Sequence, residues 1–158
     1  MFYLGELREL TEVVPARLRE AEARGNLWFA TGLRSWRTNV AWLALDDPDE
    51  ARRQVELAHR QWSRDGFHLQ HYYELLANGQ IDLYVGDGKA GLERTDQHWR
   101  ALSGSLLLRV QNIRVEAQHL RARCALAEAK ASGNHRLLDI ASKAARTIER
   151  ERMPWARP

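Results

Sequence analysis

The stretch LYVGDGKAGLERTDQHW, residues 83–99, contains the turn that decides how this chain folds. Its closely spaced glycines and Lys89 have the composition of a phosphate-binding loop, whose pattern GxxxxGK[ST] must lie between a buried strand and a helix. Here a helical pattern precedes Gly86, and Ala90 occupies the position of the required hydroxyl. The segment therefore predicts a corner, in which glycine ends one helix and Asp87 caps the next.

Helical periodicity on both sides of this corner indicates the fold class. Apolar residues recur three and four positions apart, and runs of β-branched residues are scarce. Before the corner the apolar positions are Leu69, Tyr72, Tyr73, Leu76, Ala77 and Tyr84. The same reasoning predicts helices near residues 26–45 and 48–64, the second opening with acidic residues and Pro48 in its first turn. We therefore predict an all-α fold.

The predicted turns recur at similar intervals. Turns inside helical pairs fall at Asp47, Asp87 and Asn134, 40 and 47 residues apart. Turns between pairs fall at Gly25, Gly66 and Gly104, 41 and 38 residues apart. Two interleaved series of this kind predict antiparallel helical hairpins stacked as a right-handed solenoid. The predicted hairpins occupy residues 26–65, 67–102 and 104–152 of a single domain, with a partial hairpin at residues 1–25.

Composition limits the class of protein. The chain has 158 residues, 44% of them hydrophobic and 28% charged, which is typical of a folded globular domain and not of a disordered one. Its net charge of +3 is too small to indicate nucleic acid. The single cysteine, Cys124, fits a reducing compartment. The N-terminal residues lack the pattern of a signal peptide, and no apolar run is long enough to span a membrane, so we expect a cytoplasmic protein without membrane contact.

The corner sequences GD and DD, each leading into a helix with aromatic anchors, resemble the tetratricopeptide (TPR) repeat. The intervals here are longer than the usual 34 residues, so the likeness is to a TPR-like array. The segments LGEL (4–7), ARGNLWFATGLR (23–34), HYYELLANGQIDLYVGD (71–87), RVQNIRVEAQHLRARCALA (109–127) and the closing MPWARP are similar to the C-terminal helical repeats of large bacterial serine/threonine kinases and AAA-type ATPases.

This resemblance implies a protein-interaction or regulatory module that belongs to a longer signalling chain. The partner would be a protein or peptide, or the catalytic domain of the parent chain. The kinase motifs VAIK, HRD and DFG are absent from the sequence, so we expect no catalytic residues in it. Two alternatives stay open: a regulatory segment of a kinase or ATPase, and an RNA-binding helical repeat. Neither end of the chain has an obvious capping unit, which predicts some self-association.

In TPR-like arrays the first helix of each pair lines a concave groove, and its polar residues bind the partner. Carried over to this chain, the partner-binding candidates are Arg34, Thr38, His71, Glu74, Asn78, Arg109, Asn112 and Glu116, with Asn39 beside Thr38. Arginine and asparagine at such positions suit a carboxylate or a peptide backbone. The alternative for each residue is a solvated helix face with scattered ion pairs.

Other patterns of reactive residues predict no cofactor, metal or catalytic site. His68 and His71, three positions apart with Glu74 one turn further on, have the spacing of metal ligands, but the sequence offers no recognisable further ligand. Ser103 and Ser105 lie in a predicted turn between hairpins, not in a nucleophile elbow. The tryptophans Trp28, Trp36, Trp62 and Trp99 are expected to fill gaps between helices, and Trp155 to be exposed.

Overall fold

The computed structural model describes residues 4–151, and it confirms the all-α class because every regular element in that range is helical. The elements are α1 (Leu7–Ala23), α2 (Leu27–Ser35), the 3-10 helix η2 (Arg37–Asn39), α3 (Val40–Leu43), α4 (Pro48–Gln61), α5 (Leu69–Tyr84), α6 (Gly88–Gly104), the 3-10 helix η3 (Leu106–Arg109), α7 (Gln111–Ser132) and α8 (Leu137–Arg150). Residues 1–3 and 152–158 lie outside the described range, and with them Trp155 and the last residue of the predicted hairpin 104–152.

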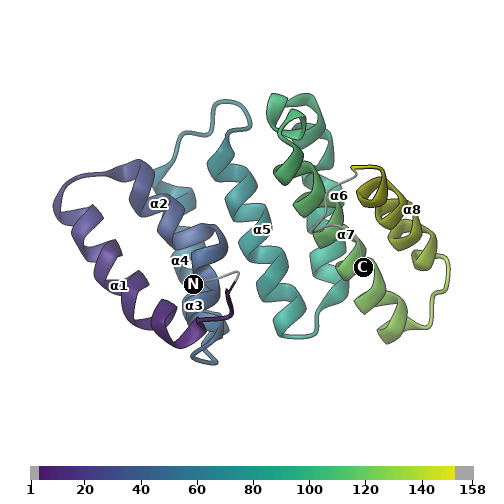
Figure 1. Ribbon diagram of the computed structural model, residues 1–158, viewed down its shortest axis with the longest axis horizontal. Coiled ribbons are helices and arrows are strands. Elements are labelled where there is room, and N and C mark those ends of the chain that lie inside the picture. The colour runs from purple at the N-terminus through teal and green to yellow at the C-terminus, as the bar shows by residue number, and fades with distance from the viewer. Residues whose placement is uncertain (1–3, 152–158) are drawn as a thin grey trace.

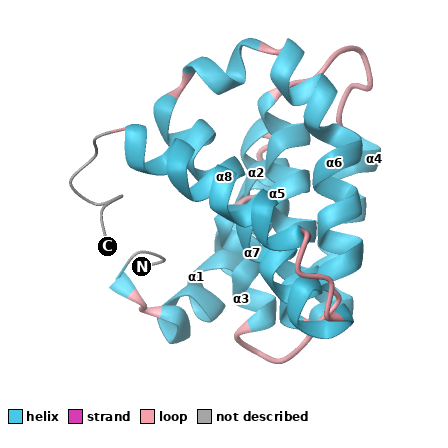
Figure 2. Ribbon diagram, turned by 90° about the vertical axis from the view of Figure 1, so that its right-hand side faces the viewer, coloured by secondary structure: helices cyan, strands magenta, loops and turns pink. Residues whose placement is uncertain are grey.

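The helices lie side by side along the long axis of the molecule, from α1 at one end to α8 at the other (Figure 1). Each packs on the next: α1 on α2, α2 on α4, α4 on α5, α5 on α6, α6 on α7 and α7 on α8. Helix α5 also contacts α2 and α7, so it lies at the centre of the row. The turned view shows only helices and loops (Figure 2).

Helix α5 takes part in each of the three clusters of buried apolar side chains. Ala77 and Ile81 belong to the cluster formed with α1–α4, and Leu76 belongs to the cluster formed with α6, α7 and α8. Tyr72 and Tyr73 pack with residues of α6 and α7 in the remaining cluster. Because most of α5 is enclosed in this way, its partly accessible polar side chains are held on a rigid element.

Three corners between helices share one construction. A residue two or three positions beyond the end of the helix, Gly25, Asp46 or Gly86, has a left-handed backbone with φ of 65°, 59° and 82°. The next backbone N–H then reaches back to a carbonyl five positions earlier, as in Asp87 to Asp82 at 2.8 Å, which is a Schellman ending. The same residue caps the following helix, since Asp87 Oδ1 accepts from the Ala90 N–H at 2.9 Å. The prediction of a corner at Gly86 and Asp87 is confirmed.

We expect Asp47→Ala and Asp87→Ala each to lower the free energy of unfolding by about 1 kcal/mol, because each removes the same N-cap hydrogen bond. The bonds have equal length, 2.9 Å, in both corners. Asp49→Ala, also in the first turn of α4 but without a cap bond, is the control and should cost less than about 0.5 kcal/mol. Urea titrations measure all three. Equal losses at Asp49 and Asp47 would contradict the capping role.

The helix predicted near residues 26–45 is interrupted, so that prediction was wrong in its continuity. Helix α2 ends at Ser35, and Trp36 has a non-helical ψ of −152°. At the break, side-chain donors replace backbone N–H groups as the partners of two carbonyls. Thr38 Oγ1 donates to Leu33 O at 2.9 Å, and Asn39 Nδ2 donates to Arg34 O at 2.8 Å. Polar side chains that bond the nearby backbone compete with helix, which is the physical reason for the interruption.

The junction before α7 also differs from the prediction. Gly104 is the last residue of α6 and does not have a left-handed backbone. The chain reverses instead through η3, where Ser105 Oγ donates to Leu102 O at 2.7 Å and accepts from the Leu107 N–H at 3.3 Å. As a result α7 begins at Gln111, several residues later than expected.

The tryptophans are distributed differently from the prediction. Trp28 is 55% exposed near the start of α2, so the expectation that it fills a gap between helices was wrong. The tryptophan that is buried in the core is Trp42 of α3. Trp36 does pack between elements, with its ring stacked on Tyr73 at a centroid distance of 5.0 Å.

Candidate functional site

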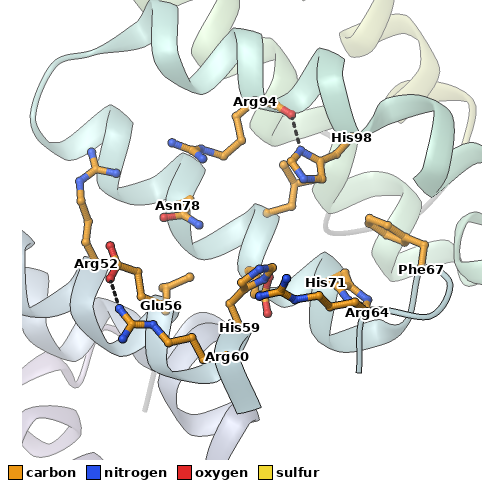
Figure 3. A pocket seen from close by; sticks show the side chains of 13 residues that line it. Arg52, Glu56, His59, Arg60, Arg64, Phe67, His71, Asn78, Arg94 and His98 are labelled. Atoms are coloured by element: carbon orange, nitrogen blue, oxygen red, sulfur yellow. Dashed lines mark hydrogen bonds and ion pairs between the residues drawn. The ribbon is translucent and has the colours of Figure 1, made fainter. Parts of the chain in front are cut away.

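A hollow of about 580 Å³ is formed by α4, α5 and α6 together with the loop between α4 and α5. We call it the α4–α6 groove, and Figure 3 shows its side chains. Polar residues dominate the lining, with an apolar part made by Val55, Phe67 and Leu75. The polar members are Arg52, Glu56, His59, Arg60, Arg64, His71, Glu74, Asn78, Arg94 and His98.

Helix α5 forms the floor. His71, Glu74 and Asn78 follow one another at three- and four-residue spacing, so they project from one face of the helix. His71 Nδ1 accepts from the His68 backbone N–H at 2.9 Å, which ties the ring to the helix start. Burial lowers the pKa of His71, because the charged imidazolium loses hydration there. The neutral form is therefore favoured, and it is also the form whose Nδ1 can accept this bond.

Glu74 lies in the middle of the floor, and only one of its two carboxyl oxygens has a hydrogen-bond partner. Its Oε2 lies 2.9 Å from His59 Nδ1, across the groove wall from α5 to α4. Its Oε1 is buried and has no hydrogen-bond partner within residues 4–151. A buried carboxylate oxygen without a donor is costly, so a rotation of the side chain that brings Oε1 to a ligand N–H or O–H group would relieve that cost.

Two arginines lie at the end of the groove nearest the C-terminus of α5. Arg52 of α4 and Arg94 of α6 both bind Asp82 of α5, at 2.8 and 3.0 Å. The Asp82 side chain is 1% exposed, whereas the two arginines are about a third exposed. One carboxylate therefore holds two guanidinium groups, and this end of the groove keeps a positive charge.

The opposite end is formed by the loop between α4 and α5. Arg64 and Phe67 come from this loop, and the Phe67 ring lies 5.6 Å from the His71 ring. Arg64 makes no hydrogen bond or ion pair with any other described residue. Arg60 nearby is paired with Glu56 at 3.0 Å on the exposed surface of α4.

One histidine–carboxyl contact crosses the groove. His59 Nδ1 lies 2.9 Å from Glu74 Oε2. A histidine in contact with a carboxyl group is a common arrangement for a general base. However, none of the described residues that line the groove carries a hydroxyl or thiol group that this histidine could activate.

The structure brings together three of the eight predicted site residues, His71, Glu74 and Asn78. Arg34, by contrast, is 5% exposed and inside the protein. Its guanidinium group donates to Gln54 at 3.1 Å, to Gln61 at 2.8 Å and to Glu22 of α1. The hydrogen bonds of its guanidinium group are therefore all made with side chains of α1 and α4, and Arg34 is not available to a ligand.

The remaining predicted residues lie apart from the groove. Thr38 belongs to the break after α2, as does the neighbouring Asn39, which is buried. Glu116 of α7 accepts from Arg37 Nε at 2.7 Å and from the Tyr72 hydroxyl at 2.6 Å, so it links η2, α5 and α7 internally. Arg109 ends η3 and Asn112 is the second residue of α7, and both are exposed. The eight residues do not form one continuous stripe.

Sequence reasoning missed the residues that the second helices contribute. Arg52, Glu56 and His59 recur four and three positions apart on α4, which is a recognisable polar face. The TPR resemblance directed attention to the first helices, whereas this groove opens between the second helices α4 and α6, with the first helix α5 beneath them. Asp82 was also missed, because one aspartate in an apolar helix pattern does not reveal its partners.

Reactive groups elsewhere do not form a second site in the described part of the chain. His68 and His71 have their rings 5.4 Å apart, but no group of three potential metal ligands occurs among residues 4–151. Cys124 is buried, and this burial raises the pKa of its thiol to about 11, so the nucleophilic thiolate is disfavoured. Within the same range no helix combines the length and apolar character needed to cross a membrane.

Comparisons with protein-family models, with curated proteins and with solved structures find no match to this chain.

Proposed function

We propose that this protein is a non-catalytic interaction module, a TPR-like solenoid that binds an extended segment of a partner protein in the α4–α6 groove. The observation that carries the proposal is the groove itself: a hollow of about 580 Å³ with convergent polar groups from three helices and one loop. Binding sites are usually concave, and the many polar groups of this one suit the polar backbone of a peptide.

Two further features support recognition of a chain segment. The packing of each helix on the next is the arrangement expected of a repeat array, whose grooves bind extended partners. The floor of the groove runs along α5 from His71 to Asn78, and it includes the Glu74 carboxyl group, whose buried Oε1 lacks a donor, and the Asn78 amide group. These groups suit the N–H and C=O groups of a peptide backbone.

The test is a peptide-display selection on the whole chain, followed by fluorescence anisotropy with the selected peptides. Asn78→Tyr places a bulky ring in the groove, and we expect it to weaken binding at least about tenfold, or roughly 1.4 kcal/mol. Asn112→Tyr is the matched control: it is the same substitution on the exposed surface of α7 and should leave binding unchanged. Circular dichroism first establishes that both variants fold.

The control also tests the original assignment of the site to the first helices. If Asn112→Tyr abolishes binding while Asn78→Tyr does not, the partner binds along α7 and the proposed groove is wrong. If neither substitution affects any selected peptide, the chain recognises its partner through another surface.

A further inference from the structure

We infer that the ligand of the α4–α6 groove is an acidic peptide segment with two carboxylate side chains about five residues apart and an uncharged middle, a spacing that follows from the rise per residue of helix and strand. This inference rests on the proposed function and adds the chemistry of the ligand. It follows from the order of charges along α5, which is positive, negative, positive.

The first positive end is Arg64. It lines the groove from the loop that leads into the His71 end of α5, and it makes no hydrogen bond or ion pair with any other described residue. An arginine that faces a concave surface and has its guanidinium group available is a good binding site for a carboxylate, because the contact can be bidentate. The neighbouring Arg60 contributes less, since Glu56 already lies 3.0 Å from it.

The second positive end is the pair Arg52 and Arg94. Both bind the single carboxylate of Asp82, at 2.8 and 3.0 Å, so two positive charges are balanced by one negative charge. Asp82 also holds both guanidinium groups in place, which lowers the entropic cost of binding a second carboxylate. Each arginine has several N–H donors, and only one atom of each contacts Asp82.

Glu74 lies between these ends and sets the character of the ligand's middle. Its buried Oε1 lacks a donor, and a ligand carboxylate placed next to it would be repelled. A backbone N–H, by contrast, would satisfy this oxygen. Asn78, one turn further along the same face, can both donate to and accept from a peptide unit. The middle residues of the ligand are therefore uncharged.

The length of α5 gives the spacing of the two acids. His71 marks the first end and Asp82 the second, and the rise of a helix between them is about 16 Å. An extended peptide advances about 3.3 Å per residue, so it covers this distance in about five residues. Glutamate side chains can adjust by a residue in either direction, which makes the spacing a preference and not a strict rule.

The same charge order favours a peptide over single-stranded RNA. RNA carries a phosphate at every nucleotide, so a strand along α5 would place negative charge against Glu74 as well as against the arginines. A segment with acids at both ends and amide groups between them matches each part of the groove.

The inference is tested with synthetic peptides that contain two glutamates at short, intermediate and long spacing on an Ala/Gly/Ser background, measured by fluorescence anisotropy. We expect the intermediate spacing to bind best and both Glu→Gln changes in the peptide to weaken it at least about tenfold. Arg64→Glu should reduce affinity for the acidic peptide to a similar extent. Arg146→Glu, which makes the same charge change on the exposed surface of α8, should not.

A third glutamate in the middle of the peptide provides an independent readout. It should weaken binding to the wild-type chain, and Glu74→Gln should remove most of that loss because the repulsion is gone. If peptides that depend on Asn78 bind equally well without acids, this inference fails while the proposed function stands. If acidic peptides bind but Asn78→Tyr and Arg64→Glu have no effect, the groove itself is wrong. If oligouridylate binds more tightly than the peptides and requires Arg64, the ligand is RNA and the inference is overturned.

Discussion

Asp82→Asn will lower the free energy of unfolding by about 3 kcal/mol, because removal of the anion leaves two guanidinium groups side by side without a counter-charge. Asp82 is the one carboxylate that joins Arg52 of α4 to Arg94 of α6, and its side chain is only 1% exposed. Breaking a fully buried pair costs roughly 3 to 5 kcal/mol. The lower figure applies here because both arginines are partly hydrated and can turn towards solvent.

The matched control is Asp96→Asn, which removes an exposed ion pair between α6 and α7. Asp96 lies 2.7 Å from Arg121, but its side chain is 47% exposed, so water screens the interaction. We expect a loss below about 1 kcal/mol. Equilibrium unfolding in urea measures both variants. A stability of Asp82→Asn within about 0.5 kcal/mol of the wild type would show that the two arginines do not depend on this carboxylate.

Gly88→Ala should destabilise the protein by about 2 kcal/mol, although alanine is normally the better helix residue. A Cβ atom at Gly88 would lie 2.6 Å from the backbone nitrogen of Glu128 and 2.8 Å from Cβ of Ala127, both on α7. Backbone atoms cannot move aside as a flexible side chain can, so α6 and α7 would have to separate. Overpacking of this kind costs roughly 1 to 3 kcal/mol and outweighs the gain in helix propensity, which is below about 1 kcal/mol.

Gly104→Ala, at the other end of α6, is the control for propensity alone. Nothing lies within 4 Å of the position its Cβ would take, so we expect it to be neutral or to stabilise by up to about 1 kcal/mol. The two variants make the same chemical change in the same helix, and thermal and urea unfolding compare them directly. Losses of equal size would mean that α7 does not pack against Gly88 as closely as the structure indicates.

The fold class and the corners could be predicted from the sequence because both depend on local interactions. Spacing of apolar residues is a property of one helix, and the N-cap bond of Asp87 joins atoms only three residues apart. Such signals are present wherever the segment folds. The interruption after Ser35 was less predictable, since Asn39 Nδ2 also donates to Ala51 O of another helix at 3.0 Å, a contact that periodicity alone does not contain.

The candidate site could be predicted only in part. His71, Glu74 and Asn78 share a helix face, and the sequence places them there with helical geometry alone. The sequence could not show that Arg34, one of many arginines in this chain, is enclosed by Gln54 and Gln61 of α4. Burial depends on which helices pack together, and a resemblance to TPR arrays suggested the first helices when the groove lies between the second ones.

By itself, then, the sequence determined that this protein is helical and that the glycine-rich segment after α5 is a corner. Only the tertiary structure decided which polar residues meet: it placed Arg52 and Arg94 on Asp82, left Oε1 of Glu74 without a donor, and set Arg64 at the end of the groove. The physical reason is range. Helix propensity and capping act over about four residues, whereas a binding groove depends on charges and surfaces that packing brings together from distant parts of the chain.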